Sequence, residues 1–173
     1  ITVLFWFAFR DVFAGQMNRF PSEPLTIDHI AREEDIMNAT DRVGVTTLTT
    51  PSDREVLITR VVDAPREIVF RAWTDPQQVV QWWGPDGFTT TLDEMDVRPG
   101  GHWRFVMHGP DGRDYRNHVV YIEVDPPARL VYKHVPEKDT EPITFESTVT
   151  FTALGGRTEV VLRALFPSEK TLE

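Results

Sequence analysis

The fold is decided by the stretch RPGGHWRFVMHGPDG, residues 98–112, which places one strand between two turns. Within it Trp103, Phe105 and Met107 share one side of the alternation, and His102, Arg104 and His108 lie on the other. This period of two is typical of a strand with one buried face. The glycine and proline residues on both sides predict tight turns. We therefore expect one strand of an antiparallel sheet, with its three large apolar side chains on the same face.

The same pattern of strands and turns extends outward from this stretch. Strands are predicted at residues 55–62, 88–97, 101–108, 113–124, 129–135, 143–153 and 157–166. Two short helices are predicted after the first strand, one opened by Pro65 and one by Asp75 with Gln78 three residues later. Strands joined by short turns cannot form a parallel sheet, which needs helical crossovers. The sequence predicts an α+β fold with a curved antiparallel β-sheet.

Residues 1–50 differ from the rest and are interpreted as an N-terminal extension. Residues 1–20 are rich in aromatic side chains, and residues 43–51 are rich in threonine. One interpretation is a loosely ordered leader. The other is that residues 1–20 dock on apolar surface of the same chain or of a second copy, which would give a homodimer, because exposed aromatic clusters favour association. Residues 51–173 are predicted to form one domain.

Composition excludes several classes of function. The net charge of −9 argues against nucleic acid as a partner, because phosphate binding needs a positive field. The absence of cysteine excludes disulfides and thiolate metal sites. The apolar opening is too short to span a membrane and lacks the features of a secretory signal. We expect a cytoplasmic protein without a bound cofactor.

Pairing across the predicted turn at Gly109–Gly112 assigns residues to the apolar face. If His108 lies opposite Arg113, Trp103 lies across from His118. His118 and Val120 would then share the face of Trp103, because side chains two residues apart point the same way.

Pairing across the later hairpins extends this face. Val124 opposite Leu130 would set Val120 beside His134. Leu154 opposite Arg157 would pair Val149 with Leu162, apolar with apolar. A curved sheet covered by short helices would then enclose an apolar cavity. We expect its lining to comprise Trp83, Trp103, Phe105, Met107, His118, Val120, Tyr132, His134 and Val149.

Several ordered motifs also carry a family resemblance. They are ITRVVDAPREIVFRAWTDP at 58–76, WWGP at 82–85, RPGGHWRFVM at 98–107 and PPARLV at 126–131. Together they resemble the bacterial proteins grouped with the activator of the heat-shock-protein-90 ATPase, in the START-related (SRPBCC) ligand-binding superfamily. The resemblance implies a helix-grip fold, in which a curved sheet grips a long C-terminal helix around a hydrophobic cavity. Because Glu173 follows closely on Phe166, that helix is expected to be missing or truncated.

His118 and His134 are the candidate polar groups of the cavity. An imidazole among aromatic side chains could orient a ligand carbonyl or act as an acid or base near neutral pH. The alternative is that each is a hydrogen-bonded structural histidine. The histidines show neither the spacing nor the carboxylate neighbours of a metal site, so no metal is expected.

These observations favour binding of a small hydrophobic molecule, for carriage or sensing. Two alternatives remain open. One is a cyclase- or hydrolase-like enzyme that acts on a polyketide-like substrate in the same cavity, with His118 or His134 as acid–base group. The other is a co-chaperone that stimulates a heat-shock-protein ATPase through the outer surface of the sheet. The sequence assigns no catalytic residue.

Overall fold

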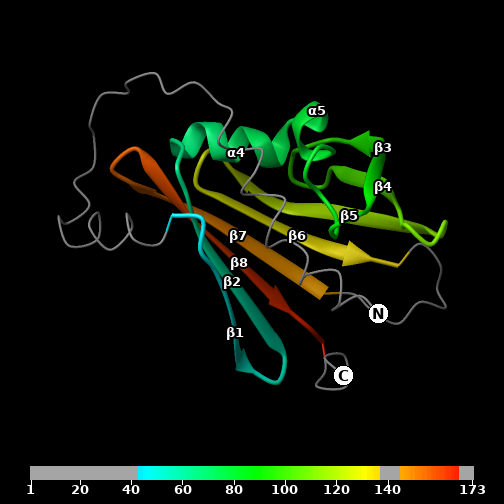
Figure 1. Cartoon of the computed structure of the whole chain (residues 1–173), viewed down its shortest axis with the longest axis horizontal. Coiled ribbons are helices and arrows are strands. Elements are labelled where there is room, and N and C mark those ends of the chain that lie inside the picture. Colours follow the sequence, from blue (N-terminus) through cyan, green and yellow to red (C-terminus); the bar gives the residue numbers. More distant parts are fainter. Residues whose placement is uncertain (1–42, 137–144, 168–173) are drawn as a thin grey trace.

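The computed structural model describes residues 43–136 and 145–167 of the chain (Figure 1). The elements defined there are β1 (Thr46–Ser52), β2 (Glu55–Val62), α4 (Arg66–Thr74), α5 (Pro76–Val79), β3 (Thr89–Met95), β4 (His102–His108), β5 (Asp114–Asp125), β6 (Arg129–Val135), β7 (Phe145–Leu154) and β8 (Arg157–Leu165). The expectations for residues 1–20 and for a truncated C-terminal helix fall on 1–42 and 168–173. Both ranges lie outside the described residues.

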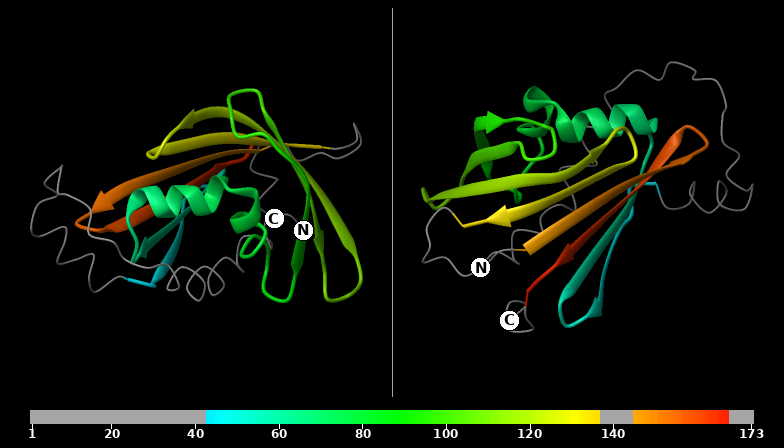
Figure 2. Two further views of the ribbon diagram at one scale, coloured as in Figure 1. Left: turned by 90° about the horizontal axis from the view of Figure 1, so that it is seen from above. Right: turned by 180° about the vertical axis from the view of Figure 1, so that it is seen from behind.

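All eight of these strands form one antiparallel sheet in the order β1-β2-β8-β7-β6-β5-β4-β3. The helices α4 and α5 lie together on one face, and Figure 2 shows the sheet curving around them. We call the face toward these helices the inner face and the opposite one the outer face. The predicted α+β fold, a curved antiparallel sheet with two short helices, is confirmed.

The predicted strands are all present, within a few residues of their expected bounds. β1 was not predicted as a strand, because its sequence lies largely in the part assigned to the 1–50 extension. It pairs with β2, with Thr46 opposite Arg60. Threonine is β-branched and suits extended backbone, which explains why this polar stretch joins the sheet. The sheet therefore begins before residue 51.

The two helices follow the predicted start signals. α4 begins directly after Pro65, whose fixed φ suits a helix start. The Asp75 carboxylate caps α5 by accepting from the Gln77 backbone N–H at 2.8 Å, and the Gln78 side chain donates to it at 3.0 Å. The buried face of α4 consists of Val69, Phe70, Ala72 and Trp73. Neither helix in the described part of the chain has the length and hydrophobicity to cross a membrane.

The hairpin between β4 and β5 differs by one residue from the predicted pairing. His108 faces Asp114 and not Arg113. The Gly109 N–H donates to the Arg113 carbonyl at 2.8 Å, which leaves three residues in the loop. Gly112 ends this loop with φ of 78°, the left-handed conformation of a three-residue hairpin loop.

This one-residue difference reverses the face of β5 side chains. Trp103 lies opposite Val119, which is fully buried, and not opposite His118. Because a slip of one residue moves each side chain to the other face, His118 and Val120 point outward. Their predicted inward orientation is wrong.

A β-bulge explains why the predicted pairing of β5 with β6 assigned the same β5 residues to the wrong face. The predicted pair Val124–Leu130 is present, but the register shifts between Tyr121 and Glu123. The bulge makes Tyr121, and not Ile122, the residue opposite Tyr132. The predicted β4–β5 and β5–β6 registers were therefore each wrong by one residue, and both placed the same part of β5 on the wrong face.

The hairpin between β7 and β8 has the predicted register. Leu154 lies opposite Arg157, and Val149 lies opposite Leu162. The turn between them is made by two glycines with positive φ, Gly155 and Gly156. The inner face of these two strands was therefore assigned correctly from the sequence.

Candidate functional site

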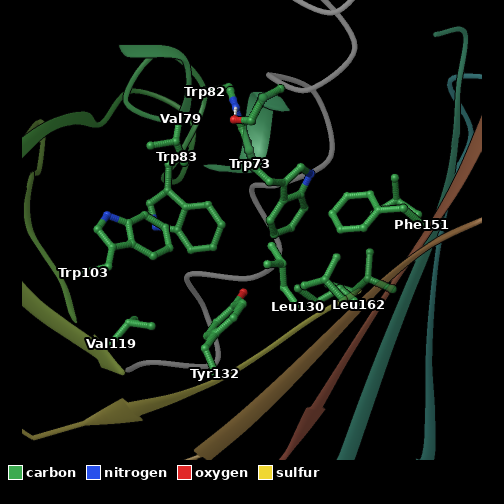
Figure 3. Packing of buried hydrophobic residues seen from close by; sticks show 14 of the residues in the cluster. Trp73, Val79, Trp82, Trp83, Trp103, Val119, Leu130, Tyr132, Phe151 and Leu162 are labelled. Carbon is green, nitrogen blue, oxygen red and sulfur yellow. Dashed lines mark hydrogen bonds between the residues drawn. The ribbon is translucent and has the colours of Figure 1, made fainter. Parts of the chain in front are cut away.

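A wall of three tryptophans stands over the inner face of the sheet (Figure 3). Trp73 belongs to α4, Trp83 follows α5, and Trp103 comes from β4. The ring centroid of Trp83 lies 4.7 Å from that of Trp103 and 5.7 Å from that of Trp73, both edge-on. The Thr90 hydroxyl donates to the Trp83 carbonyl at 2.6 Å, which ties the turn after α5 to β3. These contacts hold the wall in one arrangement, because edge-to-face pairs add about 0.5–1.5 kcal/mol each beyond area burial.

The sheet opposite this wall carries a row of hydroxyl groups. Tyr121 faces Tyr132 across β5 and β6, and Tyr132 faces Ser147 across β6 and β7. Tyr132 is 1% exposed and Ser147 is 0% exposed. Figure 3 shows the Tyr132 hydroxyl pointing from the sheet toward the tryptophan side chains. The interior thus combines an aromatic wall with a polar row on an otherwise apolar floor.

Three buried polar atoms of this interior lack hydrogen-bond partners among the described residues. They are the Tyr132 Oη, the Ser147 Oγ and the Trp103 Nε1. A buried polar group without a partner costs about 1–3 kcal/mol, so folded proteins seldom leave one unsatisfied. A ligand or an ordered water between the wall and the sheet would supply the missing partner.

Burial sets the charge of the titratable groups in this interior. Burial raises the pKa of Tyr121 and of Tyr132, because desolvation disfavours the phenolate. The neighbouring Tyr121 raises the pKa of Tyr132 further, whereas Ser147 beside its hydroxyl acts in the opposite direction without reaching regular hydrogen-bond geometry. Burial lowers the pKa of His134 to about 3. His134 is half-buried as a whole residue, and its Nε2 atom is enclosed. All of these side chains are therefore uncharged at neutral pH.

The structure brings most of the predicted lining residues together. His134 stacks on Phe145 with ring centroids 4.1 Å apart and lies 5.6 Å from the Tyr132 ring. The predicted residues that face this interior are Trp83, Trp103, Phe105, Met107, Tyr132, His134 and Val149. His118 and Val120 do not join them, because the one-residue shift in the β4–β5 pairing turns them to the outer face.

On the outer face, the histidines pair with other polar side chains. The His102 Nδ1 and the His118 Nε2 are 2.8 Å apart. The His108 Nδ1 contacts the Asp114 Oδ1 at 2.7 Å, and the His108 Nε2 contacts the Thr91 Oγ1 at 2.8 Å. This order of hydroxyl, imidazole and carboxylate is that of hydrolase triads, but all three groups are exposed, whereas triad chemistry depends on a site sheltered from water. We interpret them as a cross-strand network that stabilises β3, β4 and β5.

The predicted lining lacked Trp73 of the aromatic wall and two hydroxyl-bearing residues, Ser147 and Tyr121. Ser147 had a signal, since Phe145, Ser147, Val149 and Phe151 alternate along β7 and only one of these inward residues is polar. A lone hydroxyl on an apolar strand face is a candidate contact for a ligand. Tyr121 had no such signal, because its inward orientation depends on the bulge after it.

A protein-family model described as activator of Hsp90 ATPase homolog 1-like protein matches residues 63–173. The matched span includes every described element from α4 to β8. No curated protein matches the chain.

Solved structures of bacterial proteins share the fold. Protein Ms6760 from Mycobacterium smegmatis is 27% identical, with a TM-score of 0.66 and a match that covers 73% of this chain and 82% of that chain. A Chromobacterium violaceum protein is 25% identical, with a TM-score of 0.62 and coverage of 66% and 81%. A Staphylococcus epidermidis protein is 25% identical, with a TM-score of 0.65 and coverage of 73% and 79%. The arrangement of sheet and helices is therefore common to proteins from several bacteria.

Proposed function

Because the chain belongs to the family of activator of Hsp90 ATPase homolog 1-like proteins, we propose that it binds a small hydrophobic molecule between its sheet and helices. The bound molecule would be carried or sensed. The lining would consist of the predicted residues that face the interior, together with Tyr121 and Ser147. Apolar walls with a few placed polar groups are the usual composition of small-molecule sites.

The observation that carries this proposal is the set of buried polar atoms without partners. Tyr132 and Ser147 are opposite each other in the sheet, and neither hydroxyl has a hydrogen bond among the described residues. Such groups destabilise a protein unless something satisfies them. A hydrophobic ligand with one polar group would satisfy them and displace any water from the aromatic wall.

Native mass spectrometry of freshly purified protein tests the proposal directly. We expect a retained small molecule on the wild type. Ser147→Leu fills the floor and should lose the adduct, while Thr148→Leu adds similar bulk at the next position of β7, which faces outward, and should keep it. Circular dichroism establishes that each variant is folded. Tyr132→Phe is a gentler second variant, which keeps the ring and removes only the hydroxyl.

A fluorescent probe gives an independent measurement. N-phenyl-1-naphthylamine is neutral and hydrophobic, and its emission should rise on binding to the wild type and to Thr148→Leu. A wild-type protein that carries no adduct and leaves the emission of this probe unchanged would contradict the proposal.

A reaction in the same interior is the second candidate. His134 favours it, because it is the one of the two predicted acid–base histidines that faces the interior. Its lowered pKa of about 3 makes it a weak base at neutral pH, which favours binding over catalysis. If a reaction occurs, His134→Phe should abolish turnover of the retained molecule and spare its binding.

Two further proposals concern protein partners. The family description suggests stimulation of an Hsp90 ATPase, for which the outer face would be the contact surface. ATPase assays with added protein test this, and an unchanged rate would argue against it. We also retain the proposal that residues 1–20 dock on the same chain or a second copy. Deletion of 1–20 without change of melting temperature or solution mass would refute it.

A further inference from the structure

We propose that the ligand is an uncharged, flat molecule whose single acceptor group, such as a ketone or amide carbonyl, is held by Tyr132 and Ser147. This inference rests on the proposed function and narrows it to one chemical class. It depends on three features of the interior: the kind of polar group that lacks a partner, the aromatic wall, and the position of the charged side chains.

The unsatisfied groups of the interior are all able to donate. The Tyr132 and Ser147 hydroxyls each have one O–H donor, and the Trp103 indole N–H can donate a hydrogen bond but cannot accept one. Tyr132 and Ser147 are register partners on neighbouring strands, so their hydroxyls lie on the same part of the floor. A carbonyl oxygen has two lone pairs and can accept from both hydroxyls at once. A ligand group that can only donate would leave the O–H protons of both hydroxyls without an acceptor.

The wall opposite these hydroxyls favours a flat ligand. Trp83 lies 4.7 Å from Trp103 and 6.1 Å from Phe105, ring centroid to ring centroid. The Tyr132 hydroxyl points toward this wall (Figure 3). A ligand whose carbonyl meets the floor therefore places its body against aromatic rings. Planar π-systems gain most from such a surface, through stacked and edge-on contacts.

The charged side chain of the inner face lies far from the hydroxyls. Among the inward-facing strand residues that the structure describes, Arg60 is the charged one, and it donates to the Thr46 hydroxyl. In the register Arg60 is level with Phe151, whereas Ser147 lies four residues further along β7. At about 3.4 Å per residue and about 4.8 Å per strand, the two backbones are roughly 16 Å apart. Tyr132 is one strand further away.

The other titratable groups around the interior do not supply a positive charge near the hydroxyls either. Arg66 opens α4 one turn before Phe70, which contacts Phe151, so it lies at the Arg60 end of the sheet. His134 lies beside Tyr132, and its lowered pKa keeps it neutral. A buried carboxylate without a cationic partner is strongly disfavoured. Fatty-acid-like anions are therefore disfavoured at this site, and neutral ligands are favoured.

Three probes with one naphthalene body test the inference on the full chain. 2-Acetylnaphthalene carries a neutral carbonyl, 2-ethylnaphthalene carries no polar group, and 2-naphthoate carries a carboxylate. Quenching of tryptophan fluorescence gives each dissociation constant at pH 7. We expect 2-acetylnaphthalene to bind about 3- to 10-fold more tightly than 2-ethylnaphthalene, which is the range of one net hydrogen bond. 2-Naphthoate should bind at least about 10-fold more weakly than 2-acetylnaphthalene.

Variants connect this preference to the two hydroxyls. Tyr132→Phe and Ser147→Ala should each reduce the preference for 2-acetylnaphthalene over 2-ethylnaphthalene to about 2-fold or less, with 2-ethylnaphthalene still bound. His118→Ala, on the outer face of the neighbouring strand, should leave all three constants unchanged.

The outcomes separate this inference from the function on which it rests. Equal binding of all three probes, or tighter binding of 2-naphthoate, would overturn the neutral-carbonyl inference and leave hydrophobic binding intact. A preference that persists in both Tyr132→Phe and Ser147→Ala would overturn the role of these hydroxyls. Failure of all three probes and of N-phenyl-1-naphthylamine to bind would overturn both proposals together.

Discussion

The two faces of the sheet treat polar side chains in opposite ways. On the outer face, Arg104 donates to Glu94 at 2.6 Å, and His102 contacts His118 at 2.8 Å. On the inner face, the Tyr132 and Ser147 hydroxyls are buried and have no hydrogen bond among the described residues. The outer polar groups are thus satisfied within the chain and by water, whereas the inner ones need something that the described chain does not provide. This difference supports the proposal that the inner face is the binding face.

Two histidines show the contrast in a single residue type. His118 is half-buried on the outer face and hydrogen-bonds to a second imidazole. His134 is stacked on Phe145, and burial lowers its pKa to about 3. The sequence predicted the same role for both, and the fold gives them different ones.

The largest expected effect is the loss of unfolding free energy when a large side chain is removed from the inner face rather than from the outer face. Trp103 is 2% exposed and contacts Trp83, so Trp103→Ala should lower the unfolding free energy by about 3–5 kcal/mol through cavity formation. Ile122, at the outer bulge, is 43% exposed, and Ile122→Ala should change it by no more than about 0.5 kcal/mol. Urea denaturation measures both. Comparable losses in the two variants would break the distinction between the faces.

The second prediction concerns stability at acidic pH. The pKa of His134 is about 3 in the folded protein against an ordinary value of 6.5. Between these values the unfolded chain binds more protons, so the unfolding free energy should fall as pH decreases from about 6.5, by up to about 1.4 kcal/mol per pH unit. His134→Phe should flatten this dependence and retain stacking on Phe145. Identical slopes for the two proteins, measured by denaturation at pH 4 to 8, would show that the imidazole is not enclosed.

A third prediction concerns the stability of the protein when the Tyr132 hydroxyl is removed. In protein stripped of ligand by unfolding and refolding, Tyr132→Phe should be as stable as the wild type or more stable, by up to about 1 kcal/mol, because it removes a buried polar group without a partner. Removing a satisfied polar group has the opposite sign: His118→Ala loses its bond to His102 and should destabilise by about 1 kcal/mol. Melting curves of both variants test the pair, and a destabilised Tyr132→Phe would mean that the hydroxyl is already satisfied.

The smallest expected effect is that of an outer ion pair. Arg104 and Glu94 are 39% and 47% exposed in their side chains, so solvent screens their attraction. A double-mutant cycle with Arg104→Ala and Glu94→Ala should give a coupling of about 0.2–1 kcal/mol that decreases in high salt. A coupling well above this range would indicate that the outer face is sheltered from water by a partner.

The sequence predicted the elements well and the faces of one strand badly. Alternation around Trp103 and the β7–β8 pairing of Val149 with Leu162 gave correct inward residues, because these depend on local pattern and on a two-glycine turn. The face of β5 depended on counting residues in a loop and on a bulge beside Ile122. Neither has a strong local signal, so the count was wrong by one in both places. The predicted lining therefore included Trp83 and Trp103 of the aromatic wall, and it lacked Trp73 and the hydroxyl-bearing residues Tyr121 and Ser147.

What the sequence alone determined is the class of the fold and the apolar stripe of most strands, because backbone geometry fixes which neighbouring residues share a face. Only the tertiary structure decided which hydroxyls meet inside. Tyr132 and Ser147 are brought together by the pairing of β6 with β7, and their burial depends on helices that come from an earlier part of the chain. Hydrogen bonding and desolvation depend on such distant neighbours, and a one-residue change of register replaces all of them at once.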